Sequence, residues 1–219
     1  MSDREVRVSP ERLEGWITRF AEHHSQGGPD TLVTSLTPDA LLLTASDGAT
    51  ASLQNLWLDP LPAPDDPIAG FLIHVGRRRR VALLLARKSA HAVGIAFGTD
   101  LEVHRVDTHY IQGRTKAGGW SQQRYARRRG NQASKAFSDA RDDVEELLLP
   151  RVADLEGFAC GGDRTAVAAV LDGFDELEAL RTRHRVLATP DPRLVVLADF
   201  AAEIRKVPIV LNDLAAFSA

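Results

Sequence analysis

The first apolar stripe of the chain has a helical spacing and lies within residues 10–24. Its members stand three or four positions apart and predict one buried helix face: Leu13, Trp16, Ile17 and Phe20. Further on, residues 41–46 and 49–54 are β-prone runs on either side of Asp47-Gly48. Because Asp-Gly is a favoured two-residue turn, these runs predict a β-hairpin.

The apolar pattern in the central part of the chain predicts strands followed by one long helix. Residues 81–87, 91–97 and 101–111 are apolar or alternating runs joined by short turns, which predicts an antiparallel meander. From 121 to 149 an apolar stripe recurs at spacings of three, four and seven, which predicts a helix that Pro150 ends.

The remainder alternates between strands and helices. We expect strands at 157–160, 184–188 and 207–211 and helices at 163–171, 174–183 and 191–206, with Asp163 capping the first of these helices. Antiparallel strands followed by alternating elements predict an α/β (α+β) fold with a mixed β-sheet and flanking helices.

A proline-rich segment at 59–67 is the best candidate for a linker, since four of its residues are proline. It predicts an N-terminal extension of helix plus β-hairpin, 1–66, and a main α/β domain, 67–219. A rigid surface loop is the alternative interpretation.

Composition narrows the class of protein. Apolar residues make up 44% and charged residues 26%, which is typical of a folded globular chain. The first residues are charged and lack an apolar run, so we expect no signal peptide, no membrane span and a cytoplasmic protein. Cys160 is the single cysteine, which excludes an internal disulfide and indicates a small buried side chain.

Charge is distributed unevenly. Residues 113–137 carry seven cations and no acid, although the whole chain has a net charge of −3. A local positive segment on an acidic chain is typical of a surface that binds a polyanion. At its uncharged apex, Gly118-Gly119 lets the backbone approach a partner closely, and Trp120 can stack on a base. Gln122 and Gln123 cannot act as general bases, but their amides can orient water.

This glycine-rich loop between a strand and an arginine-rich helix resembles the middle domain of eukaryotic and archaeal peptide-chain release factors. The sequence Gly-Gly-Trp-Ser-Gln resembles the motif of the Vms-like release-factor family, in its bacterial branch. The resemblance covers the loop at 113–123 closely and residues 80–215 loosely. It implies an RNase H-like fold and hydrolysis of peptidyl-tRNA on stalled large ribosomal subunits, with no cofactor and no metal.

The resemblance also implies the roles of individual residues. The implied catalytic residues are Gly119, Ser121 and Gln122. The implied contacts to ribosomal RNA and tRNA are Arg114, Lys116, Trp120, Gln123, Arg124, Arg127, Arg128 and Arg129. Because Trp120 and Ser121 are inserted relative to Gly-Gly-Gln, the working glutamine is either Gln122 or Gln123. We expect a monomer, since a tip that enters a narrow cavity favours one.

Several alternatives stay open. The protein could cleave tRNA near its 3′ end, or bind the ribosome or another RNA without catalysis. Arg77–Arg80 could contact phosphate or form a charged strand end. Asp100, Glu102 and His104 alternate along one strand and could imitate a metal-dependent nuclease site, but we favour the solvent-exposed face of an edge strand, because no motif ties a further carboxylate to them.

Overall fold

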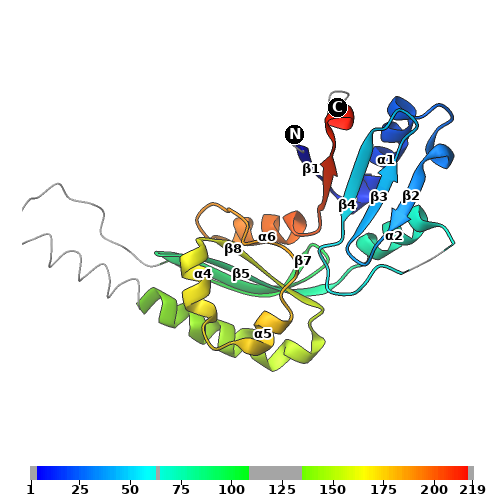
Figure 1. Ribbon diagram of the computed structural model, residues 1–219. Coiled ribbons are helices and arrows are strands. Elements are labelled where there is room, and N and C mark those ends of the chain that lie inside the picture. Colours follow the sequence, from blue (N-terminus) through cyan, green and yellow to red (C-terminus); the bar gives the residue numbers. More distant parts are fainter. Residues whose placement is uncertain (1–3, 63–64, 109–134, 217–219) are drawn as a thin grey trace, which may run out of the picture. The chain divides into compact units, whose positions relative to one another are not determined.

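A computed structural model describes residues 4–62, 65–108 and 135–216 of the chain (Figure 1). The chain divides into two compact units. Unit 1 comprises Met1–Arg78 and Arg205–Ala219, and unit 2 comprises Arg79–Ile204. The domain boundary expected after residue 66 stays a prediction, whereas the compact units divide the chain after Arg78 and again after Ile204.

Unit 1 is an antiparallel sheet with helices on one face. Its elements are β1 (Arg4–Val8), α1 (Pro10–His24), the 3-10 turn η1 (Pro29–Thr31), β2 (Val33–Leu36), β3 (Ala40–Thr44), β4 (Thr50–Gln54), α2 (Pro67–Gly76), β9 (Val207–Leu211) and α7 (Asp213–Ala216). The strand order is β1-β9-β4-β3-β2. Side chains of α1 and α2 pack with the inner strand residues in one apolar core.

Both N-terminal predictions from the sequence are confirmed. The helix α1 begins at Pro10, whose fixed φ suits the first helical position, and it buries Leu13, Ile17 and Phe20. The strands β3 and β4 pair across the predicted turn, where Gly48 has a φ of 90° that favours glycine.

Unit 2 is a mixed sheet with helices on both faces, which confirms the expected fold class. Its elements are β5 (Arg80–Arg87), β6 (Ala90–Phe97), β7 (Asp100–Thr108), a helix over residues 135–147, the 3-10 turn η2 (Leu149–Asp154), β8 (Gly157–Gly162), α4 (Arg164–Leu171), α5 (Asp175–Ala179) and α6 (Leu194–Glu203). The strand order is β7-β6-β5-β8. The meander β5-β6-β7 is antiparallel as predicted, and β8 is parallel to β5.

The two faces of the unit 2 sheet are covered differently. Helix 135–147, α4 and α5 contribute to one apolar core, and α6 packs on the opposite face (Figure 1). The helix α6 lies close to Gly94, where a Cβ would lie 3.0 Å from Leu197 Cδ2. In the described parts of the chain, no helix combines the length and apolarity that a bilayer crossing requires.

The strand expected at 184–188 is wrong. Within 184–188 only Leu187 pairs with β8, through an isolated bridge to Gly161, and a second isolated bridge joins Arg181 to Phe158. The two bridges are three positions apart on β8, from Phe158 to Gly161, but six positions apart on the neighbouring segment, from Arg181 to Leu187. The extra residues between Arg181 and Leu187 therefore do not pair with β8. Among them His184 is buried, and its ring nitrogens bond to Thr182 Oγ1 and the Ile204 carbonyl.

Candidate functional site

The predicted catalytic and RNA-binding residues lie outside the described residues, in the interval 109–134. They are Arg114, Lys116, Gly119, Trp120, Ser121, Gln122, Gln123, Arg124, Arg127, Arg128 and Arg129. Their roles stay predictions. The structure does describe the two elements that precede and follow this interval, β7 and the helix over 135–147.

The helix that follows the interval has the apolar face predicted for it. Ala140, Val144 and Leu148 are fully buried under the unit 2 sheet. The α-helix ends at residue 147, and Pro150 lies in the 3-10 turn η2 that follows. The outer face is acidic, with Asp142, Glu145 and Glu146 exposed.

A polar cluster joins β7 to this helix. Arg105 of β7 donates through Nη1 to Asp143 Oδ1 at 2.8 Å and to Glu146 Oε2 at 2.6 Å. The other oxygen of Asp143 lies 2.9 Å from Nε2 of the buried His91 on β6. One carboxylate thus holds the helix to two strands. We call Arg105, Asp143, Glu146 and His91 the stem clamp.

The environment of Asp143 favours its charged form. Burial raises the pKa of Asp143, but hydrogen bonds from Arg105 and His91 and their charges outweigh it, so the pKa lies below its ordinary value of 3.8. The same carboxylates raise the pKa of the Arg105 guanidinium. The charges of Asp143 and Arg105 therefore persist throughout the neutral range.

The lowered pKa of Asp143 predicts a pH-dependent stability. A carboxylate whose pKa is lower in the folded state stabilises the fold above its unfolded pKa, here about 4, and loses that contribution as the pH falls through the folded-state value. Asp143→Asn should lower the free energy of unfolding at pH 7 by about 1–2 kcal/mol. It should also flatten the decline below pH 4, measured by urea unfolding.

Asp142→Asn is the matched control, because Asp142 is the exposed neighbour of Asp143 on the same helix. It should leave both the unfolding free energy and its pH dependence close to wild type. Equal effects of the two substitutions would contradict the stem clamp.

No sequence signal points to the stem clamp. His91 and Asp143 are 52 residues apart, and Arg105 joins them only because β7 pairs with β6 in the observed register. Pattern analysis recognises elements, but it does not give the rotation of a helix against a sheet.

Two charged groups from the sequence analysis serve internal contacts. Glu102 accepts bidentate hydrogen bonds from Arg80 at 2.8 and 2.9 Å, and the same guanidinium lies over the Phe97 ring. Arg79 is buried. These contacts favour the charged strand end over a phosphate contact at Arg79 and Arg80. In the described residues, no group of three His, Cys, Asp or Glu side chains could hold a metal ion.

The cysteine behaves as a core residue. Cys160 is 3% exposed within β8, and burial raises the pKa of its thiol to about 12. We expect a thiol reagent at pH 8 to label Cys160 in denaturant but, because the native thiolate is scarcer by a factor on the order of 10³, barely in the folded protein. Mass spectrometry of labelling time courses measures this. Rapid native labelling would contradict the buried position.

Part of this chain matches a known protein family, and a solved structure is similar to it. Residues 79–210, more than half of the chain, match the family described as Actinobacteria/chloroflexi VLRF1 release factor. Among solved structures, the archaeal translation termination factor aRF1 is similar with a TM-score of 0.43 and 13% identity, over 88% of this chain and 61% of that one. This chain thus spans about three fifths of the length of aRF1. No curated protein matches the chain.

Proposed function

The chain belongs to the Actinobacteria/chloroflexi VLRF1 release factor family, and from this premise we propose that it hydrolyses peptidyl-tRNA on stalled large ribosomal subunits. Membership gives it a release-factor-like role in translation. The ester hydrolysis, the ribosomal RNA and peptidyl-tRNA partners, the cytoplasmic location and the rescue of stalled subunits are our proposal.

One observation carries the proposal. The acid-free segment 113–137 holds seven cations around the neutral sequence Gly-Gly-Trp-Ser-Gln. It follows β7, and its last residues begin the described part of the helix over 135–147. Cations surrounding a neutral amide suit a segment that binds RNA phosphates and brings the amide to a reacting ester.

The proposed chemistry assigns each residue a limited role. Gly118 and Gly119 permit close backbone approach, and Trp120 stacks on a base. The amide of Gln122 orients the attacking water, or donates a hydrogen bond to the oxyanion that forms on the ester carbonyl. Water attacks the carbonyl carbon, the bond to the ribose 3′ oxygen breaks, and that oxygen leaves with a proton. Since an amide does not titrate, groups of the ribosome or the tRNA must transfer the protons.

Analysis of both reaction products tests the proposal. Large subunits that carry peptidyl-tRNA are incubated with the protein, and the peptide and the tRNA are recovered. Ester hydrolysis leaves the peptide without nucleotides and the tRNA with an intact 3′-terminal adenosine. A shortened tRNA would instead establish nuclease cleavage, and tight binding without any product would establish a non-catalytic factor.

A further inference from the structure

One end of the unit 2 sheet lies near the starts of α4 and α6 and near the first described residues of the helix over 135–147. Arg87 pairs with Ala90 and Ala90 with Thr108, so the turn after β5, the start of β6 and the end of β7 lie together. The end of β8 lies there too, because Ala86 pairs with Gly162, and α4 begins two residues later.

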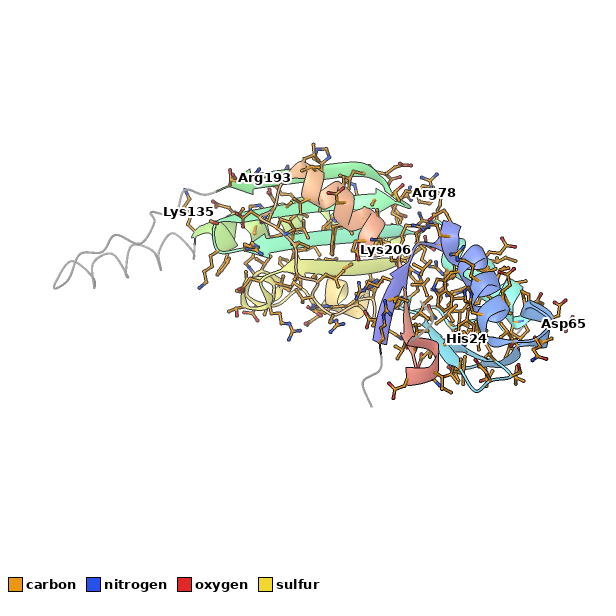
Figure 2. All side chains as sticks on the ribbon, turned by 90° about the horizontal axis from the view of Figure 1, so that it is seen from above. His24, Asp65, Arg78, Lys135, Arg193 and Lys206 are labelled. Carbon is orange, nitrogen blue, oxygen red and sulfur yellow. The ribbon has the colours of Figure 1, made fainter. Side chains whose placement is uncertain are left out.

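The segment before α6 reaches the same end. The Arg87 guanidinium donates to the carbonyl of Thr189 at 2.6 Å and to Asp191 at 3.3 Å. Lys135 lies at this end as well, together with Arg193 (Figure 2). Lys135 precedes Asp143 by eight residues, which is about 12 Å of helix. Asp143 contacts His91 near the start of β6.

Four exposed cations occupy this end, each on a different element. They are Lys88 in the β5–β6 turn, Lys135 on the helix over 135–147, Arg164 at the start of α4 and Arg193 before α6. We call these four residues the basic rim. Within the described part of the chain, none of the four forms an ion pair or a side-chain hydrogen bond.

The acids at this end already have internal partners. Asp163 caps α4 by accepting from the Ala166 amide at 2.9 Å, and Asp191 accepts from Arg87. Asp107 and Asp139 also have partners. These carboxylates already have contacts within the protein, whereas the four rim cations form no ion pair within the described residues, so the rim cations are available to an anionic ligand.

We propose that the basic rim binds the phosphate backbone of ribosomal RNA. This inference rests on the proposed function, and it adds contacts from the described elements of unit 2 to those proposed for residues 113–129. The sheet is four strands wide, about 14 Å, so cations distributed over its end can meet several phosphates along one RNA strand. RNA is the favoured occupant because Lys135 belongs to the same acid-free run, 113–137, that we propose binds RNA. Lysine ammonium and arginine guanidinium groups both bind phosphate oxygens.

Salt-dependent binding to large subunits tests the rim with a matched pair of variants. Arg164→Gln/Arg193→Gln removes two rim cations, and Arg12→Gln/Arg19→Gln removes two exposed arginines of α1. Each lost phosphate contact should reduce the slope of log affinity against log salt by about 0.7–0.9. We therefore expect the rim variant to lose about 1.5 units of slope and at least tenfold in affinity, while the α1 variant keeps both.

The rate of peptide release at saturating protein separates binding from chemistry. The rim variant should release peptide at the wild-type rate once bound, because the rim contacts RNA and not the ester. If a rim variant kept its affinity and slope while the wild-type protein released peptide, the RNA-binding role of the basic rim would be contradicted. The proposed function would then stand. Failure of wild-type protein to release peptide would instead overturn the proposed function.

A second rim variant covers the case in which the first fails to fold. Lys88→Gln/Lys135→Gln changes a turn and a helix position, both exposed, and should show the same loss of slope. Thermal unfolding verifies that each variant is folded. A folded second variant with wild-type affinity and slope would also overturn the proposal.

Discussion

Replacing Gln122 by alanine should slow peptide release by about 10²–10³-fold at saturating protein, with little change in affinity for the large subunit. Removal of one preorganised hydrogen-bond donor or acceptor at a reacting ester typically costs this much in rate. Alanine leaves the seven surrounding cations in place, so the electrostatic attraction to RNA persists. Single-turnover release of a labelled peptide measures the rate, and subunit pelleting measures the affinity.

Gln123→Ala is the matched control, because it removes the same amide one position later. If Gln122 positions the water, Gln123→Ala should change the rate by less than tenfold. The reverse ranking would assign catalysis to Gln123. Equal, wild-type rates in both variants would contradict an amide-based hydrolysis and favour a protein that binds RNA without chemistry.

Gly162→Ala should give the largest loss of stability among the substitutions considered. Gly162 has a φ of 102°, which costs alanine about 1–2 kcal/mol. A Cβ there would also collide with the backbone carbonyl of Ala86, so β5 and β8 would have to separate locally at a further cost of about 1–3 kcal/mol. The sum predicts a loss of about 2–5 kcal/mol in the free energy of unfolding, measured by urea titration.

Gly76→Ala controls for the general effect of adding a methyl group. No atom lies within 4 Å of a Cβ at Gly76, and its φ is not positive. It should change the stability by less than about 1 kcal/mol. A Gly162→Ala protein as stable as Gly76→Ala would show that the turn between β8 and α4 tolerates a side chain.

Local patterns predicted much of this fold because several elements are specified by neighbouring residues. The stripe on α1 and the turn at Gly48 lie within short windows, and both were located correctly. The helix α2 was missed, since its mostly apolar run lies directly behind the proline-rich segment and shows little polar alternation. β1 was missed because its partner β9 is about 200 residues away.

The candidate site, too, is only partly predictable from local sequence patterns. Residues 118–123 are recognisable because a contiguous run carries the chemistry. The stem clamp and the basic rim are assembled from distant segments, such as Lys88 and Arg193, whose proximity depends on strand register and on the Arg87 contacts. Single-sequence patterns contain no such long-range information.

The position of β9 has a consequence for how the protein is made. β9 is the only strand neighbour of β1 within the described residues, and it also pairs with β4. During synthesis, β1 and the edge of β4 that faces away from β3 therefore have no strand partner until Val207–Leu211 has emerged. A factor proposed to rescue interrupted translation would itself be vulnerable to interruption, since a nascent chain arrested before Val207 could not complete the sheet of unit 1.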